Sequence, residues 1–156
     1  MDVPTQRLPM LPNQPNNFEP RTYEITDDSS SARSKTILIL EDDSTFADTL
    51  KQLLDSQGYG ITIVPTGAEG LQKILAADFD AIVCDMVMPN FPGDMFYLAV
   101  QRARPHLTKR FIFTTGHQSD PKIAGFIKKS GCPALFKPFE MRDLFDALET
   151  VTGRSK

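Results

Sequence analysis

The sequence predicts an open α/β fold in which helices cover both faces of a five-stranded parallel sheet. Five short apolar runs alternate strictly with five helical segments between Thr36 and Val151, and this alternation is typical of a parallel sheet. The runs are continuously apolar, which indicates strands that are buried on both faces. Because the sequence ends after the fifth unit, a doubly wound open sheet is favoured over part of a larger barrel.

Each strand is predicted from a short, β-rich apolar run that is too brief for a helix. The first run, TILIL, precedes three acids, and the third, AIVC, leads directly into Asp85. The five strands are expected over Thr36–Leu40, Ile61–Val64, Ala81–Cys84, Phe111–Thr114 and Ala134–Phe136.

Each helix is predicted from apolar residues that recur every three or four positions. The first helix is expected to end at Gln57 or Gly58, and the third to cover Gly93–Arg104. The first four helices are opened by Asp43 and Ser44, by Thr66 and Gly67, by Gly93, and by Pro121, respectively. In the third helix, the residues expected to face the core are Phe96, Ala99, Val100 and Ala103.

The overall composition excludes several classes of protein. Hydrophobic residues make up 40% of the chain and charged residues 24%, as in an ordinary globular protein. The net charge is -3 without any basic block, so neither nucleic acid nor an anionic membrane is an expected partner. No apolar run approaches the length of a membrane helix, and the proline-broken amino terminus does not read as a signal peptide. Cys84 and Cys132 are expected to be reduced and the chain to be cytoplasmic.

Three segments are expected along the chain. Residues 1–34 carry five prolines in the first 20 positions and no periodic pattern, which predicts a disordered or loosely attached tail. A docking peptide is the alternative, because three of these prolines are spaced three residues apart. Residues 35–153 form the predicted domain, and residues 154–156 form a second, short tail.

Polar residues that can do chemistry follow four of the five predicted strands. The carboxyl ends of parallel strands lie at one edge of an open sheet, where ligands bind. In the strand order 2-1-3-4-5 the first and third strands are neighbours, so their acids are expected to converge on one crevice. The residues after strands one, three, four and five are Glu41, Asp42 and Asp43; Asp85; Thr115 and Gly116; and Lys137 and Pro138, respectively.

The charges at this edge predict a divalent cation and a phosphoryl group. Asp42 and Asp85, with Glu41 nearby, would repel one another without a cation between them. Oxygen ligands and water suit Mg²⁺, whereas two cysteines and two scattered histidines do not make a usual zinc site. A carboxylate beside Mg²⁺, a threonine hydroxyl and Lys137 can accept a phosphoryl group as an aspartyl phosphate.

Four motifs resemble, in order and spacing, those of the receiver domain of two-component response regulators: ILILEDD, IVCDMVMPNFPG, FIFTTG and LFKPFE. The resemblance covers roughly Lys35 to Gly153 and implies a flavodoxin-like fold with the strand order 2-1-3-4-5. It implies a phosphoprotein of a phosphorelay, which changes its contacts with a partner protein when it is phosphorylated. The implied phosphodonor is a histidine kinase or a histidine phosphotransfer protein. The downstream target is left open, and so is a homodimeric state.

The resemblance assigns the metal ligands residue by residue. Asp85 is implied to be both the phosphorylated aspartate and a Mg²⁺ ligand. Asp42 is implied to bind the ion directly and Glu41 mostly through water. The backbone carbonyl of Val87 would complete the ligands that the protein supplies.

On the phosphoryl side, the resemblance implies two further roles. Thr115 would bond a phosphoryl oxygen, and Lys137 would pair first with Asp85 and then with the phosphoryl group. The Lys137–Pro138 peptide bond is implied to be cis, an isomer that costs little only before proline. Pro89 and Gly93 match the loop that leads into the third helix, where turn chemistry accounts for both.

The sequence departs from the family pattern or varies within it at three positions. Ala134 stands where many receiver domains carry an aromatic residue that takes part in switching, so the mode of output is open. Val87 and His117 occupy positions that influence attack of water on the phosphoryl group. Apolar Val87 is predicted to hinder water and to prolong the phosphorylated state, while His117 and His106 are otherwise expected to be surface histidines.

Two other functions compete with that of a phosphorylated signalling module that turns over no external substrate. A phosphatase of the haloacid dehalogenase type would need an acid two residues after Asp85, where this chain has Val87. A receiver-like scaffold that is never phosphorylated would not need the complete set of site residues. The resemblance implies an output face over the fourth helix, fifth strand and fifth helix. This face includes Lys128, Lys129, Arg142 and Asp143, although a charged solvated surface explains these residues equally well.

Overall fold

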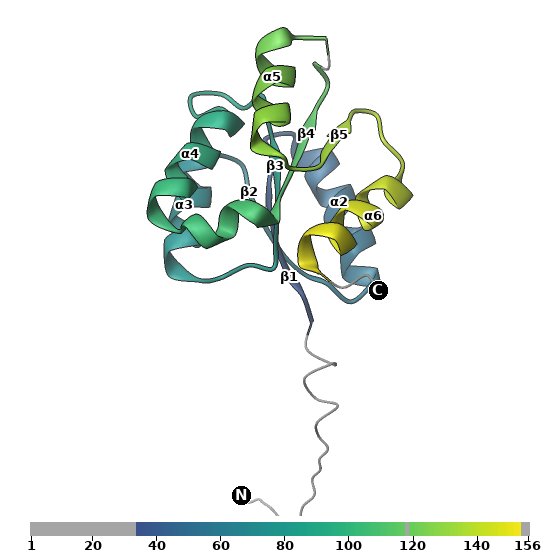
Figure 1. Cartoon of the computed structure of the whole chain (residues 1–156). Helices are drawn as coiled ribbons and strands as arrows, with labels where there is room; N and C mark the ends of the chain where they lie inside the picture. Colours follow the sequence, from purple (N-terminus) through teal and green to yellow (C-terminus); the bar gives the residue numbers. More distant parts are fainter. Residues whose placement is uncertain (1–33, 118, 154–156) are drawn as a thin grey trace, which may run out of the picture. The chain divides into compact units, whose positions relative to one another are not determined.

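The computed structural model describes residues 34–117 and 119–153, so the expected tails at 1–34 and 154–156 lie outside the described residues apart from Ser34. Five parallel strands form one sheet in the order β2-β1-β3-β4-β5, flanked by helices (Figure 1). This order confirms the predicted fold. The strands are β1 (Thr36–Leu40), β2 (Gly60–Val64), β3 (Ala81–Asp85), β4 (Phe111–Thr115) and β5 (Ala134–Phe136). The helices are α2 (Ser44–Ser56), α3 (Gly67–Ala76), α4 (Gly93–Ala103), α5 (Pro121–Ser130), α6 (Met141–Thr152) and the 3₁₀ helix η2 (Pro105–Arg110).

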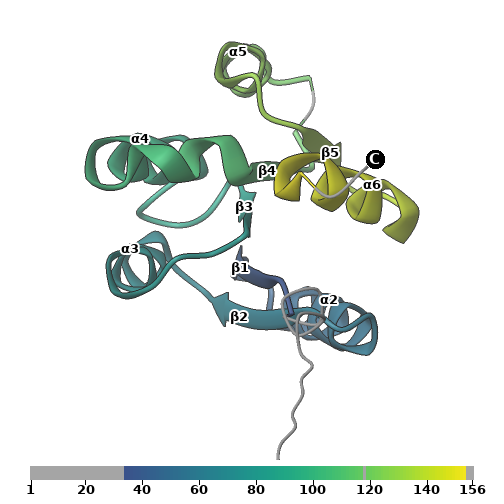
Figure 2. The same cartoon turned by 60° about the horizontal axis from the view of Figure 1, so that its bottom comes forward.

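Two hydrophobic clusters cover the two faces of the sheet. Because successive residues of a strand point to opposite faces, Leu38 and Leu40 of β1 join the cluster beneath α3, α4 and α5. Ile37 and Ile39 join the cluster beneath α2 and α6. Figure 2 shows α3 and α4 on one side of the sheet and α2 and α6 on the other. Burial on both faces is the reason that the strand sequences are continuously apolar.

The helices begin and end close to where the sequence predicts. The side chains of Asp43 and Thr66 cap α2 and α3 by accepting hydrogen bonds from backbone N–H groups of the first turn, as helix N-caps do. Pro121 is the first residue of α5. Helix α2 ends at Ser56, shortly before Gly58, which has a φ of +90°.

One prediction about the core was wrong. Ala103 was expected to face inward from α4, but it is exposed, and Ala99 is only half-buried. Tyr97 is buried instead, with its ring packed edge-on against Phe111 and Phe126. The reason is tertiary: α4 ends at Ala103, and the unpredicted η2 then turns the chain back toward β4.

The structure bears on the predictions about membrane helices and about the two cysteines. No described helix combines the length and apolar character that crossing a membrane requires. Cys84 is buried and Cys132 is half-buried, and neither takes part in a disulfide.

Candidate functional site

Three carboxylates meet at the carboxyl edge of the sheet. Glu41 and Asp42 follow β1, and Asp85 is the last residue of β3, which pairs with β1. One oxygen of each carboxylate lies within 4.8 Å of the other two. Glu41 and Asp85 are buried, whereas Asp42 is exposed. Parallel pairing of two non-consecutive strands thus assembles the acidic group.

The ammonium of Lys137 lies against two of these carboxylates. Its Nζ is 3.0 Å from Oε1 of Glu41 and 3.1 Å from Oδ2 of Asp85. The backbone N–H of Lys137 donates to the carbonyl of Thr115, so the root of the side chain is fixed by the end of the sheet. The Lys137–Pro138 bond is cis, as the resemblance implied. The contact of Lys137 with Glu41 was not predicted.

Burial and charge shift the pKa values of this pair. Burial raises the pKa of Glu41, and the opposing effects of Lys137 and the Asp43 N–H do not cancel it. Burial also disfavours the charged form of Lys137, but Glu41 and Asp85 outweigh this and raise its pKa. Lys137 therefore stays protonated at neutral pH. Positive charge added to the crevice would lower the pKa of Glu41, because it favours the ionised form.

The donor set fits a hard divalent cation. Oδ1 of Asp85 accepts a hydrogen bond from the Val87 N–H (3.0 Å), and Oε2 of Glu41 accepts one from the Asp43 N–H (3.1 Å). A carboxylate oxygen has two lone pairs, so these oxygens retain capacity for a further partner. Asp42 is open to solvent, which leaves room for the waters that Mg²⁺ keeps in proteins.

Thr115 lies at the end of β4 and is fully buried. Its Oγ1 accepts a hydrogen bond from the N–H of His117 (2.9 Å), and His117 itself is exposed. Among the described residues, no hydrogen bond joins the Thr115 hydroxyl to the acidic group. Thr115 is therefore placed at the carboxyl edge by β4, and a hydroxyl oxygen that accepts one hydrogen bond leaves its O–H group able to donate.

The loop between β3 and α4 passes very close to the acidic group. A Cβ on Gly93 would lie 2.6 Å from the carbonyl oxygen of Asp85 and 2.8 Å from Cα of Met86. The Gly93 N–H donates to the carbonyl of Met86 (3.0 Å), and Asn90 takes a φ of +69°. Gly93 is thus required by close backbone approach, a stronger constraint than the turn chemistry that the sequence indicated.

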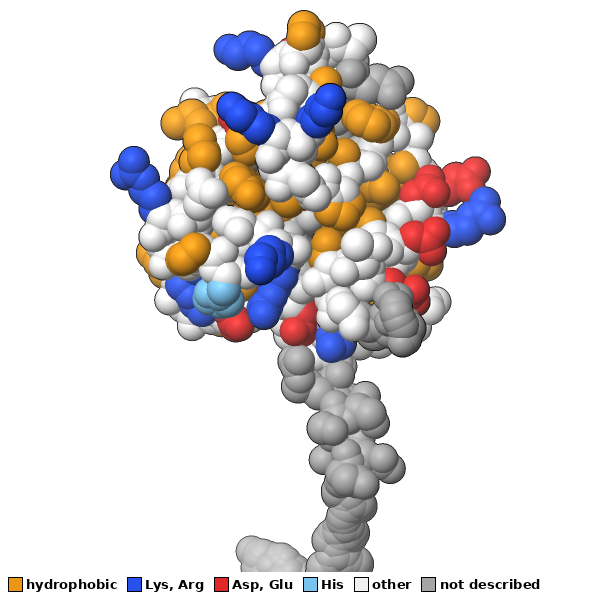
Figure 3. Space-filling model, in the orientation of Figure 1, with side chains coloured by type: hydrophobic (Ala, Val, Ile, Leu, Met, Phe, Trp, Pro, Cys, Tyr) orange, Lys and Arg blue, Asp and Glu red, His pale blue; other side chains and the backbone are white. Residues whose placement is uncertain are grey.

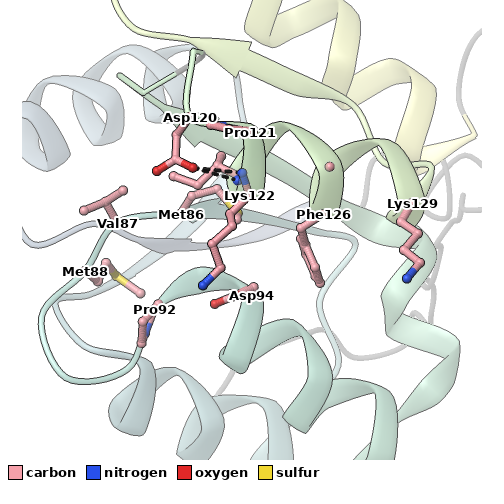
Figure 4. Close-up of a pocket in the computed structure, with 12 residues that line it drawn as sticks. Met86, Val87, Met88, Pro92, Asp94, Asp120, Pro121, Lys122, Phe126 and Lys129 are labelled. Carbon is pink, nitrogen blue, oxygen red and sulfur yellow. Dashed lines mark hydrogen bonds between the residues drawn. The ribbon is translucent and has the colours of Figure 1, made fainter.

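A groove of about 710 Å³ opens beside the site, between the β3–α4 loop and α5. Its apolar walls include Met86, Met88 and Phe126, and Figure 4 shows Lys122 and Lys129 along its α5 side. The side chain of Val87 lines the same groove and is 45% exposed. The two residues that follow Asp85, Met86 and Val87, thus both line this groove.

The face that carries α5 and β5 presents hydrophobic side chains to solvent (Figure 3). Ala134 is half-buried and packs against the cluster beneath α3, α4 and α5. Phe136 lies two residues further along β5, hence on the same face of the strand, and is 41% exposed. Ala134 thus supplies no aromatic ring at this position. The exposed ring of Phe136 lies two residues further along the same strand.

Comparison with known proteins identifies the fold and the family. The family model of the response regulator receiver domain matches residues 37–149. This chain belongs to the response regulator receiver domain family. The assignment confirms the resemblance drawn from the four motifs. It places the chain in a different family from the phosphatases of the haloacid dehalogenase type.

Solved receiver domains share this architecture over most of their length. A CheY-like receiver domain protein from Methanospirillum hungatei is 29% identical, with a TM-score of 0.69, and the match covers 79% of this chain and 100% of that one. A response regulator from Chloroflexus aurantiacus is 28% identical, with a TM-score of 0.70, and the match covers 78% and 100%.

Curated relatives are longer proteins. The response regulator ArlR of Staphylococcus haemolyticus is 30% identical over 118 residues, which are 76% of this chain and 52% of that protein. The cell cycle transcriptional regulator CtrA of Caulobacter vibrioides is 28% identical over 120 residues, which are 77% and 51%. This receiver domain therefore spans about half the length of these relatives.

Two residues near the site were missed as functional candidates. Phe46 was interpreted only as part of the helical apolar pattern, yet its ring lies 4.9 Å from Nζ of Lys137. Asp43 was predicted as a helix cap only, yet its N–H also holds Glu41. Their position in the sequence was the available signal, because both lie within four residues of Asp42, at the carboxyl edge.

Proposed function

We infer that this receiver domain accepts a phosphoryl group on Asp85, with Mg²⁺ as cofactor, as a step of a phosphorelay. The observation that carries the proposal is the position of the Lys137 ammonium, 3.1 Å from Asp85 and 3.0 Å from Glu41. A nucleophilic carboxylate, a fixed cation and an acidic group for a metal are the parts that phosphoryl transfer requires.

In the proposed step, a carboxylate oxygen of Asp85 attacks the phosphorus atom of the donor. The new O–P bond forms as the bond from phosphorus to the donor breaks, and the electron pair leaves with the donor, an imidazole in phosphohistidine or acetate in acetyl phosphate. Negative charge spreads over the phosphoryl oxygens. Lys137 is already charged and in place, so it can stabilise those oxygens with little rearrangement.

The metal site is proposed on the same carboxylates. Asp42 and Asp85 would hold Mg²⁺ directly, Glu41 would act mostly through water, and the Val87 carbonyl would complete the protein ligands. Bound there, the ion supplies positive charge that neutralises the transferring group and its donor. Thr115 would donate its O–H to a phosphoryl oxygen, which it can do while its oxygen still accepts from the His117 N–H.

The proposal extends to partners and location. The phosphodonor would be a histidine kinase or a histidine phosphotransfer protein, and phosphorylation would alter contacts with a downstream protein. The sensor kinase CckA of Brucella abortus is among the relatives, 28% identical over 128 residues that make up 13% of that protein. The chain would change only itself, without turnover of an external substrate. The cytoplasmic location stays a prediction.

Mass spectrometry of the whole chain tests the proposal. Incubation with acetyl phosphate and Mg²⁺ should add the mass of one phosphoryl group to the wild-type protein. Asp85→Asn should abolish the gain, because an amide is not a nucleophile of comparable strength. Asp55→Asn is the matched control, since Asp55 is an exposed carboxylate of α2 that pairs with Lys51.

Two results would contradict the proposal. A mass gain of equal size in Asp85→Asn would place the phosphoryl group on another residue. Absence of any gain in the wild-type chain, with acetyl phosphate and with a phosphorylated histidine phosphotransfer protein, would favour the alternative of a scaffold that is never phosphorylated.

A further inference from the structure

We propose that Phe46 is a positioning residue for Lys137, whose ammonium it holds between Glu41 and Asp85 through a cation–π contact. The inference rests on the proposed function, because its consequence is the rate at which Asp85 takes up a phosphoryl group. It assigns a role in the site to the first turn of α2.

Three groups contact the Lys137 ammonium from different sides. Two sides are the carboxylates of Glu41 and Asp85, at 3.0 and 3.1 Å. The third is the ring of Phe46, whose centroid lies 4.9 Å from Nζ, within the range of a cation–π interaction. A lysine side chain otherwise samples many rotamers, so the ring restricts where the charge can go.

The ring is itself held in place from two directions. The backbone N–H of Phe46 donates to Oδ1 of Asp43 (3.2 Å), which fixes the start of α2. The Phe139 ring meets it edge to face, with centroids 5.9 Å apart and planes at 75°. Phe139 follows the Lys137–Pro138 bond, so one short segment supplies both the ammonium and the ring that packs against Phe46.

This network also links the ring to the acidic group. Asp43 caps α2 with its side chain and holds Oε2 of Glu41 with its N–H. Lys137 then joins Glu41 to Asp85. Phe46, in the first turn of α2, contacts both Asp43 and Lys137 and so connects the two ends of this set of contacts. Loss of the ring would leave both ion pairs available but would widen the range of positions that Nζ occupies.

Phe46 is only half-buried, so it could instead serve as a docking contact for a protein phosphodonor. A small phosphodonor separates the two roles, because acetyl phosphate needs no docking surface. A positioning role predicts a defect with acetyl phosphate, whereas a docking role predicts a defect with a protein donor alone.

The experiment compares Phe46→Leu, Phe46→Tyr and Phe145→Leu with the wild-type chain. Leucine keeps an apolar side chain without a π face, and tyrosine keeps the face. Phe145 is the matched control, because it is half-buried in the same cluster beneath α2 and α6 and makes no cation–π contact with Lys137 among the described residues. The rate of phosphorylation of Asp85 by acetyl phosphate at saturating Mg²⁺ is measured for each.

Phe46→Leu should slow phosphorylation about two- to fivefold, the range of a cation–π contact at a partly exposed site. Phe46→Tyr and Phe145→Leu should keep the wild-type rate. Proton NMR supplies an independent readout: the Lys137 ε-methylene signals should be shifted upfield by the ring current in the wild type and in Phe46→Tyr, and not in Phe46→Leu.

Four outcomes would overturn the inference. An unchanged rate in Phe46→Leu would show that Lys137 needs no ring, as would equal slowing by leucine and tyrosine. Absence of a ring-current shift in the wild-type chain would remove the contact itself. Failure of the wild type to be phosphorylated by both acetyl phosphate and a phosphorylated histidine phosphotransfer protein would refute the proposed function and this inference with it, a result distinct from a defect confined to Phe46→Leu.

Discussion

Val87 is predicted to control access of water to the phosphoacceptor proposed at Asp85. Its N–H donates to Oδ1 of Asp85, so its backbone is part of the site. Its apolar side chain is 45% exposed in the groove beside the site. It cannot hydrogen-bond a water molecule for attack on a phosphoryl group at Asp85.

Val87→Asn is therefore expected to shorten the lifetime of the phosphorylated state. An amide can orient a water, and one hydrogen bond of about 1 kcal/mol in the transition state corresponds to about a fivefold faster loss of phosphoryl group. The measurement is the decay of phosphorylated protein after removal of acetyl phosphate. An equal or longer half-life in Val87→Asn would count against the prediction, and Val87→Ile is the apolar control.

At the scale of elements, the β3–α4 connection is built around a backbone contact. Gly93 begins α4, and its position beside the Asp85 carbonyl leaves no space for a Cβ. The neighbouring atoms belong to the backbone of Asp85 and Met86, so they cannot move aside as a side chain could. The close approach keeps α4 against the end of β3, the strand that carries Asp85.

Gly93→Ala should lower the free energy of unfolding by about 1–3 kcal/mol, as overpacking of a close contact does. Gly125→Ala is the matched control, because Gly125 lies within α5 with open space at its Cβ. Alanine there should stabilise the protein by about 0.5–1 kcal/mol, through the lower cost of ordering the helix. Urea denaturation of both variants checks the pair, and equal effects of the same sign would refute the argument.

A second contact between elements lies at the opposite edge of the sheet. Asp78, in the loop after α3, accepts hydrogen bonds from Arg104 and Arg110 and pairs with the ring of His106. The His106 contact is the largest of the effects that lower the pKa of Asp78, ahead of the two arginines. These contacts attach the α3–β3 loop to η2 and to Arg104, the residue before it. The η2 sequence itself has no hydrophobic periodicity.

At the scale of the whole molecule, metal binding should raise the stability of the receiver domain. Three carboxylates, those of Glu41, Asp42 and Asp85, lie together, and Lys137 places its ammonium beside two of them. A cation that binds this group only in the folded state stabilises it by mass action, by about 2.7 kcal/mol when its free concentration is about 100 times Kd. Thermal unfolding with Mg²⁺ and with EDTA measures the effect as a difference in Tm.

Asp42→Asn should reduce this difference in Tm, because it removes a charged ligand from the group. Asp55→Asn should leave the difference unchanged, since Asp55 lies on the exposed surface of α2. A Tm that does not depend on Mg²⁺ in the wild-type protein would contradict the proposed metal site.

The extent of prediction from sequence differs between parts of this molecule. TILIL and AIVC predicted buried strands because burial on both faces demands uninterrupted apolar residues. Tyr97 could not be predicted as buried, since its position depends on Phe111 and Phe126, which lie far away in the sequence. Among site residues, the acids were found by their place after strands, whereas Phe46 was hidden in an ordinary helical pattern.

The sequence by itself determined the alternation of strands and helices, the caps of α2 and α3, and the set of charged residues at one edge, because these depend on local periodicity and on strand direction. Only the tertiary structure decided that Lys137 is shared between Glu41 and Asp85, that Gly93 touches the acceptor strand, and that Phe46 covers the ammonium. These contacts join residues up to 96 positions apart. Distances of that kind are set by how strands and helices pack, which no local pattern of residues specifies.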